Sequence, residues 1–207
     1  MAACALWALV HSVLASKQAK DLARRIAGPR YRDGLYRLAY NAQSVVLLAW
    51  AARWLLRLPD HDLYTVRAPW SWLLRGAQAT SLDVLLSGVR VVGVLEFAGI
   101  TGLWKLLTGK DLSPEPEAQG PPVGSDNEVI RAGAFRFTRH PGNLGALGFF
   151  LFLPRMTANR AVLTTLVAVY VVLGSLHEEH RLRAAHGAAY ERYRRSVPFL
   201  IPRPPQN

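Results

Sequence analysis

Two short polar clusters in this chain hold the side chains best suited to chemistry. The first is Arg139-His140, directly before Pro141 and an apolar run, and the second is Glu178-Glu179, at the end of a later apolar run. Imidazole and carboxylate groups are common general bases in enzymes. Carboxylates in such a place could also bind an ammonium group, a sulfonium group or ribose hydroxyls. The residue types therefore predict a polar site beside an apolar segment.

The sequence between the clusters predicts a helical hairpin that brings them together. Leu144–Pro154 and Ala161–Leu176 are apolar, and the polar turn "RMTANR" (Arg155–Arg160) separates them. Pro141 suits the first turn of the first helix, where its missing N–H costs nothing. It also pushes the residues before it to extended backbone. We expect this to leave the backbone groups of residues 138–140 free to meet a ligand.

Structural roles for the same residues stay open at this point. Arg139 and His140 could anchor a helix at lipid headgroups, and the two glutamates could pair with nearby arginines. Three glycines leave room on the first helix of the hairpin for either a ligand or a neighbouring helix: Gly142, Gly145 and Gly148. His11, inside an apolar run, is predicted to be a satisfied interior histidine rather than a ligand.

Composition limits what kind of protein this is. Of 207 residues 51% are hydrophobic, yet the net charge is +11. A basic chain fits either nucleic-acid binding or a membrane protein with cationic loops. No helix-turn-helix, zinc finger or RNA-binding aromatic motif is present, so no nucleic-acid partner is predicted. The single cysteine, Cys4, excludes an internal disulfide, and no Cys/His spacing predicts a metal site.

Five apolar stretches predict an all-α, polytopic membrane helix bundle whose partner is the lipid bilayer. A spanning helix needs roughly 20 residues, with about 17 as the lower limit. Only the third stretch clearly satisfies this, so the prediction rests on the set. The first is expected to be a retained span rather than a secretory signal, because no basic residue precedes it. The stretches are Ala2–Ser16, Tyr40–Leu56, Asp83–Leu107, Leu144–Pro154 and Ala161–Leu176.

Charge distribution predicts the orientation of this bundle. Most basic residues fall in the loop after the first stretch, in the loop after the third and in the tail. By the positive-inside rule these parts face the cytoplasm. We therefore expect a multi-pass protein of a bacterial inner membrane with a cytoplasmic C-terminus.

The chain divides into three predicted segments. Residues 1–107 are N-terminal membrane spans, residues 108–129 a flexible, Pro- and Gly-rich cytoplasmic loop, and residues 130–207 the hairpin and a C-terminal helix. That last helix is expected to be basic, amphipathic and cytoplasmic, lying on the membrane surface as a cover over the site. Its apolar face is predicted to carry Leu182, His186, Ala189 and Tyr193.

The order of these motifs resembles the isoprenylcysteine carboxyl methyltransferase superfamily. The matching residues run from "GAFRFTRHP" (Gly133–Pro141) and Gly145 through the Glu178-Glu179 pair to "GAAYERY" (Gly187–Tyr193) and Val197-Pro198. Bacterial methanethiol S-methyltransferases and phospholipid N-methyltransferases carry related versions. The resemblance covers about a third of the chain.

This resemblance implies an integral-membrane methyltransferase that uses S-adenosylmethionine as its cofactor. The methyl group would pass directly to the acceptor. A base would be needed only for a thiol or ammonium acceptor, with Glu178 or His140 in that catalytic role. Asn143 stands where the family has a tyrosine. The cofactor-binding residues predicted in this way are Thr138, Arg139, His140, Pro141, Asn143, Gly145, Glu178 and Glu179.

The acceptor and two other functions stay open. The segments "HSVLASKQAK" and "LPRMTANRAVL" are similar to parts of the methanethiol S-methyltransferases. They favour a small or lipophilic thiol over a protein isoprenylcysteine, with a carboxylate acceptor as another possibility. The C-terminal layout is also similar to sterol reductases, which use NADPH, and to NnrU-like membrane accessory proteins that are not enzymes. The sequence does not predict an oligomeric state.

Overall fold

Helices make up most of the chain in the computed structural model, which describes residues 2–55, 57–114, 116 and 120–202, with side chains from residue 5 onward. The side chain of Cys4, part of the predicted 108–129 loop and the last five residues lie outside the described residues. The described part contains eight α-helices, one 3₁₀ helix and two short strands. The predicted all-α class therefore fits, apart from one small sheet.

Internal contacts divide the chain into two compact units. The N-terminal unit comprises Met1–Leu58 and Gly93–Glu117, and the C-terminal unit comprises Pro59–Val92 and Ala118–Asn207. This division differs from the three predicted segments, because residues 59–92 group with the hairpin. The functional meaning given to those segments stays a prediction.

The N-terminal unit is built around the long helix α3 (Pro29–Leu55). Helices α1 (Ala2–Ala15), α2 (Lys17–Ala27), α5 (Val94–Ala98) and α6 (Ile100–Leu107) pack against it. His11 of α1 lies with Nδ1 2.8 Å from the Ser44 hydroxyl and Nε2 2.6 Å from the Tyr40 hydroxyl. The prediction of a satisfied interior histidine is confirmed.

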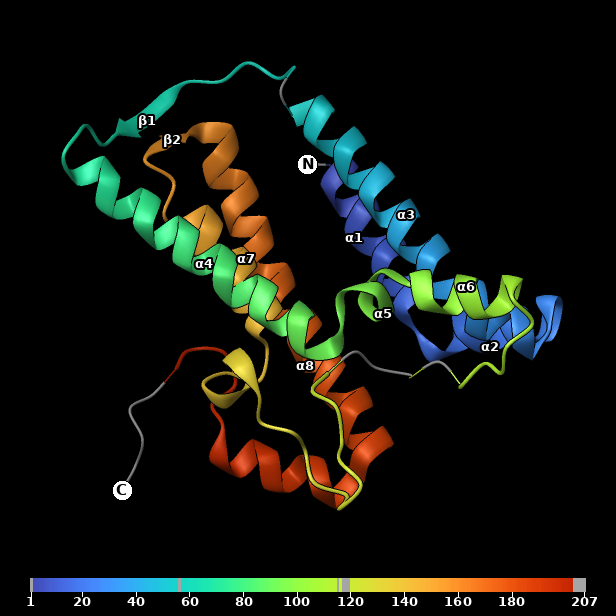
Figure 1. Cartoon of the computed structure of the whole chain (residues 1–207). Helices are drawn as coiled ribbons and strands as arrows, with labels where there is room; N and C mark the ends of the chain where they lie inside the picture. The colour runs from blue at the N-terminus through green and yellow to red at the C-terminus, as the bar shows by residue number, and fades with distance from the viewer. Residues whose placement is uncertain (1, 56, 115, 117–119, 203–207) are drawn as a thin grey trace. The chain divides into compact units, whose positions relative to one another are not determined.

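The C-terminal unit contains the predicted hairpin. Helix α7 (Pro141–Leu151) leads through strand β2 (Arg155–Thr157) into helix α8 (Ala158–Ser196), and the two helices contact each other. Strand β2 pairs antiparallel with β1 (Asp62–Thr65), so the expected polar turn is part of a small sheet. Figure 1 shows this sheet at the end of α7 opposite Pro141.

Helix α4 (Trp70–Val92) is the main neighbour of α7 in this unit. Figure 1 shows the two helices side by side, with the 3₁₀ helix η1 (Gly133–Arg136) beyond the Pro141 end of α7. The predicted third span, Asp83–Leu107, is wrong as one continuous helix. Gly93 and Gly99 have positive φ of 98° and 83°, which a right-handed helix cannot contain, and they separate α4, α5 and α6.

Among the described residues, one helix is long and apolar enough to cross a membrane, namely α8. Ala5–Ala15 is a shorter apolar helix. Helix α7 has 11 residues, which gives it a length of roughly 16 Å, about half of a hydrocarbon core. The bundle of about five spans and its orientation stay predictions.

The second half of the predicted flexible loop, residues 120–129, packs against α8. Val123 and Val129 form an isolated β-bridge, and Val129 is buried among the tyrosines of α8. A Cβ atom on Gly120 would lie 2.6 Å from Leu182, so the chain passes close over α8 there. Residues 120–129 thus lie across α8 and contact it at both ends of the segment.

Candidate functional site

The hairpin brings the two predicted polar clusters into direct contact. His140 is the last residue before α7, and Glu178 and Glu179 lie on α8. The Nδ1 atom of His140 lies 3.1 Å from Oε2 of Glu178, and Nε2 lies 3.4 Å from Oε1 of Glu179. The imidazole is 2% exposed. One buried ring therefore bridges two carboxylates that neighbour each other in sequence.

Two arginines complete this ionic cluster around Glu179. The Nε atom of Arg139 lies 2.9 Å from Oε1 of Glu179, and that of Arg194 lies 3.3 Å from Oε2. Arg139 also donates from Nη1 to the backbone carbonyl of Arg194 at 3.3 Å. A carboxylate taken out of water is stable only when its charge is paired and its oxygens are hydrogen-bonded. The charge of Glu179 is paired with Arg139 and Arg194, and its Oε1 atom is hydrogen-bonded to His140, so Glu179 holds the cluster together.

Glu178 differs from its neighbour in its access to solvent. Its side chain is 20% exposed, against 6% for Glu179, and among the described residues its ion-pair partner is His140. It is therefore the carboxylate of the cluster that a ligand can reach. The open alternative in which the glutamates simply pair with arginines describes Glu179 well and Glu178 poorly.

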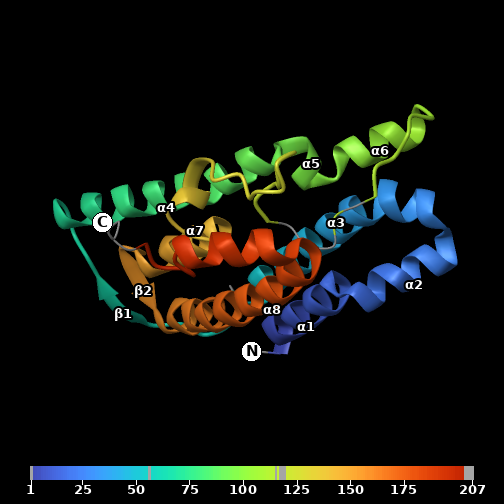
Figure 2. The same ribbon diagram turned by 90° about the horizontal axis from the view of Figure 1, so that it is seen from below.

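Helix α8 turns back on itself to supply Arg194. At Gly187 the backbone has φ 49° and ψ −122°, a conformation that side chains with a Cβ rarely adopt. Figure 1 shows the last segment of α8 turned sharply away from the direction of the long preceding segment, and Figure 2 shows the same turn from below. An ion pair of 3.2 Å joins Arg183 and Glu191 across the turn. The expectation that Leu182, His186, Ala189 and Tyr193 lie on one face of a single helix is therefore wrong, because the turn at Gly187 separates the first two from the last two.

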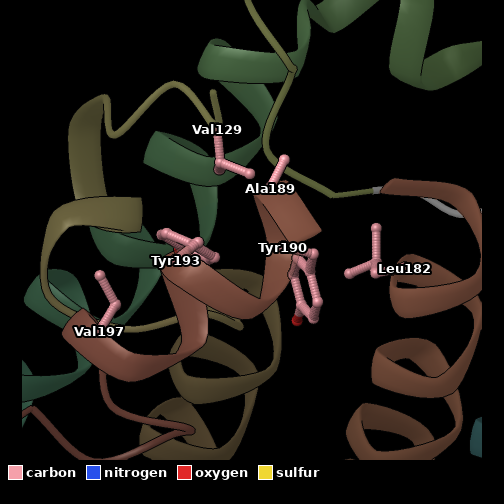
Figure 3. Close-up of a cluster of buried hydrophobic side chains, with 6 residues drawn as sticks. All are labelled: Val129, Leu182, Ala189, Tyr190, Tyr193 and Val197. Atoms are coloured by element: carbon pink, nitrogen blue, oxygen red, sulfur yellow. The ribbon is translucent and has the colours of Figure 1, made fainter. Parts of the chain in front are cut away.

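The fold-back creates a small hydrophobic core next to the ionic cluster. Figure 3 shows Leu182 on one segment of α8 facing Tyr190 on the other, with Tyr193 and Val129 beside them. Leu182, Tyr190 and Tyr193 are each 1% exposed. Apolar packing thus holds the second segment over the first, and Arg194 is held against Glu179 as a consequence.

The segment after α8 fixes the backbone around His140. The Arg139 N–H donates to the Pro198 carbonyl at 3.0 Å, and the Thr138 hydroxyl donates to the Phe199 carbonyl at 3.4 Å. The N–H groups of Thr138 and His140 donate to the Ala134 carbonyl and to the Thr138 hydroxyl. The expectation that the backbone of residues 138–140 is free for a ligand is wrong for these N–H groups, because long-range and turn hydrogen bonds use them.

The surroundings of His140 favour its protonated form. Burial lowers the pKa of His140, but the hydrogen bonds that its ring makes to Glu178 and Glu179, and the charges of these carboxylates, together raise it, and the net pKa lies above the ordinary 6.5. An imidazolium can donate from both nitrogens at once, which suits a ring between two carboxylates. His140 is therefore poorly suited to the role of catalytic base and well suited to holding Glu178 in place.

The other residues predicted to bind the cofactor, Gly145, Pro141 and Asn143, lie at contacts between helices. A Cβ atom on Gly145 would meet the Ser81 carbonyl oxygen and, at 2.7 Å, the Leu85 side chain, so α4 fills the room expected there. Pro141 lies against Gly88 of α4 in the same way. The amide of Asn143 donates to the Ser175 hydroxyl at 2.8 Å and ties α7 to α8.

Sequence reasoning missed the α4 side of this unit. Ser81 and Gly88 are small residues seven positions apart, which places them on one face of a helix and marks a surface for close packing. That signal was present in the sequence. The contacts of Arg194 and Phe199 had no comparable local signal, because both depend on the turn at Gly187.

A separate cavity of about 150 Å³ lies in the N-terminal unit, with Asp33, Arg37, Glu96 and Lys105 among its lining residues. Asp33 pairs with Arg32 at 2.7 Å, and Arg37 donates to the Glu96 carbonyl at 3.2 Å. These two charged residues of the lining therefore make contacts with other residues of the N-terminal unit.

Proteins similar to this chain are named methanethiol S-methyltransferases. The chain is 25% identical to methanethiol S-methyltransferase 1 of Bradyrhizobium diazoefficiens over 205 residues. This aligned region covers 96% of this chain and 64% of that protein. It is 27% identical to the methanethiol S-methyltransferase of Mycobacterium tuberculosis, which covers 96% of this chain and 75% of that protein. It is 38% identical to the protein of that name from Crocosphaera subtropica over 68 residues, which is 33% of this chain and 27% of that protein.

The chain thus spans just under two thirds of the length of the Bradyrhizobium protein. Similarity over nearly the whole chain suggests a relationship to the methanethiol S-methyltransferases. No family model and no solved structure matches the chain. The wider resemblance to the isoprenylcysteine carboxyl methyltransferases stays a prediction.

Proposed function

We propose that this chain is an integral-membrane methyltransferase that transfers a methyl group from S-adenosylmethionine to a small thiol. The observation that carries the proposal is the imidazole of His140 between the carboxylates of Glu178 and Glu179 at the foot of an apolar hairpin. The similarity to proteins named methanethiol S-methyltransferase supports the thiol as acceptor. A carboxylate acceptor has no comparable support.

The chemistry of the cluster fits such a methyl donor. S-adenosylmethionine supplies a methyl group on a sulfonium, and its ammonium and ribose hydroxyls are hydrogen-bond donors. Glu178 is partly exposed and has acceptor capacity beyond its contact with His140. A carboxylate is the group that binds such donors most strongly. Glu178 would hold the donor, while His140, Arg139 and Glu179 would hold Glu178.

Preorganisation is what the rest of the cluster contributes. Fixed charges in a partly dry site need little rearrangement when the charge of the reacting groups changes. Holding both reactants in line supplies a large part of the rate enhancement of a two-substrate transfer. His140 is locked by two carboxylates and by the edge of the Phe199 ring, whose centroid lies 5.3 Å away. The cluster therefore keeps its geometry through the reaction.

The proton of the thiol needs an acceptor in this proposal. As the acceptor sulfur forms its bond to the methyl carbon, the bond between that carbon and the sulfonium breaks and its electron pair stays on the donor sulfur. The S–H proton leaves the acceptor, and we assign its uptake to Glu178, the more accessible of the two carboxylates. His140 is not assigned this step, because it is already favoured as the imidazolium.

The exposed apolar surface of α8 supports a membrane location. Val169, Leu173 and Leu176 are 53%, 61% and 53% exposed, and the ionic cluster begins two residues after Leu176. A lipid bilayer would cover this surface and leave the cluster at the membrane edge. A small apolar thiol could then reach the cluster from the lipid side while a charged methyl donor arrives from water.

The test is binding and transfer by the full chain purified in detergent. Calorimetry measures binding of S-adenosylmethionine and of NADPH, and radiolabelled methyl donor measures transfer to methanethiol. We expect donor binding, thiol methylation and at least a tenfold lower kcat/KM for Glu178→Gln, which is about 1.4 kcal/mol. Glu128→Gln is the matched control, since Glu128 is a half-exposed carboxylate paired with Arg192 at the surface. Binding of NADPH without S-adenosylmethionine would indicate a reductase instead, and binding of neither would favour an accessory protein.

A further inference from the structure

The hydroxyl of Tyr190 is a buried polar group without a hydrogen-bond partner among the described residues. The residue is 1% exposed and lies on the folded-back segment of α8. Buried hydroxyl groups in proteins are nearly always hydrogen-bonded, because an unmade bond forfeits the solvation that water provided. An orphaned hydroxyl in the interior therefore needs an explanation.

The position of Tyr190 links it to the proposed site. Its hydroxyl interacts electrostatically with Glu179, with Arg139 and with Glu178, which are three of the charged residues of the ionic cluster. The oxygens of Glu179 are already used by His140 and by the two arginines. Tyr190 is thus next to the cluster, and its hydroxyl makes no hydrogen bond to the described residues.

Tyr193 shows that this state is specific to Tyr190. Tyr193 lies three residues further along the same helical segment and is equally buried, and Figure 3 shows the two rings beside each other. Its hydroxyl donates to the Phe135 carbonyl at 2.9 Å. Two tyrosines of the same burial therefore differ in one respect: the hydroxyl of Tyr193 is used within the fold, and that of Tyr190 is not.

We infer that the Tyr190 hydroxyl is a ligand-binding group that hydrogen-bonds to an acceptor atom in the nucleoside or amino-acid part of the methyl donor. The inference rests on the proposed function and adds a residue to its site. A neutral O–H group can bind an oxygen or a ring nitrogen of the donor without adding charge to the cluster. Binding of the donor would satisfy the hydroxyl that folding leaves unsatisfied.

The experiment compares Tyr190→Phe with Tyr193→Phe in the full chain. Each variant loses one hydroxyl from the same helix and keeps its ring. Calorimetry measures the Kd for S-adenosylmethionine and for S-adenosylhomocysteine, which has the same nucleoside and amino-acid parts. Thermal unfolding of the ligand-free protein measures stability.

Tyr190→Phe is expected to raise both Kd values about tenfold and to leave the melting temperature unchanged or slightly higher, because it removes an unsatisfied group. Tyr193→Phe is expected to lower the melting temperature by a few degrees, roughly 2–4 °C, because it breaks a bond that the fold uses. The opposite pattern of stability and affinity in the two variants is what distinguishes a ligand-binding hydroxyl from a structural one.

Three results would overturn the inference. Unchanged Kd values in Tyr190→Phe would show that the hydroxyl makes no hydrogen bond to the methyl donor. A loss of stability in Tyr190→Phe as large as that in Tyr193→Phe would show that the hydroxyl has a partner inside the protein. A change confined to the KM of the thiol would assign Tyr190 to the acceptor. If the unaltered chain binds neither nucleoside, the proposed function itself fails, and this is visible before any variant is made.

Discussion

The imidazole of His140 lies between two carboxylates, with Nδ1 3.1 Å from Glu178 and Nε2 3.4 Å from Glu179. Only an imidazolium donates to both at once, so the ring neutralises charge on two neighbouring side chains of α8 while it fixes the start of α7. The same contact therefore joins the two legs of the hairpin and organises the proposed site.

Replacing His140 by alanine is expected to destabilise the protein strongly. The change leaves Glu179 buried and Glu178 half-buried without the positive charge that separates them, and removing one partner from a buried ion pair typically costs about 3–5 kcal/mol. Thermal unfolding in detergent measures the effect. His180→Ala is the control, because His180 is exposed on the same helix. Equal melting temperatures for both variants would contradict the assigned role.

Stability should depend on pH through His140. Its pKa in the folded protein lies above the ordinary 6.5, so its stabilising contribution is complete below pH 6.5 and is lost as the pH rises through the folded value. The melting temperature is expected to fall as the pH rises above 6.5. In His140→Gln this fall should be flattened. A slope that persists unchanged in His140→Gln would mean that other groups cause it.

Gly145→Ala is expected to separate α7 from α4. The new Cβ atom would meet the Ser81 carbonyl oxygen and the Leu85 backbone nitrogen, and backbone atoms cannot move aside cheaply. Overpacking of this kind costs about 1–3 kcal/mol. Gly142→Ala, three residues earlier on α7, meets nothing within 4 Å and should be neutral or slightly stabilising. The measurement is the difference between the melting temperatures of the two variants. A difference near zero would show that α7 and α4 are not closely packed at Gly145.

Gly187→Ala is expected to weaken both stability and binding of the methyl donor. A Cβ atom at φ 49° is strained by about 1–2 kcal/mol, and a straighter helix would carry Arg194 away from Glu179. Gly174→Ala on the same helix has room for its methyl group and serves as the control. Calorimetry with S-adenosylmethionine and thermal unfolding report the two effects. Loss of stability with unchanged affinity would separate the turn from the site.

Local features of the sequence were enough to predict the hairpin. The start of α7 at Pro141 and the helix that contains Ala161–Leu176 are both confirmed, because proline at a first turn and long apolar runs act through neighbouring residues. The same local signals placed Arg139-His140 and Glu178-Glu179 at the two ends that a hairpin brings together. Their contact in the structure follows from this connectivity.

Long-range packing decided the rest. The breaks at Gly93 and Gly99 and the reversal at Gly187 look like tolerated glycines in an apolar or helical pattern, since composition does not record the sign of φ. The backbone N–H of Arg139 donates to the Pro198 carbonyl, 59 residues further along the chain. The hydroxyl of Tyr193 donates to the Phe135 carbonyl, 58 residues earlier. Whether a buried hydroxyl is used by the fold or left for a ligand depends on such distant atoms, so the difference between Tyr190 and Tyr193 exists only in the folded chain.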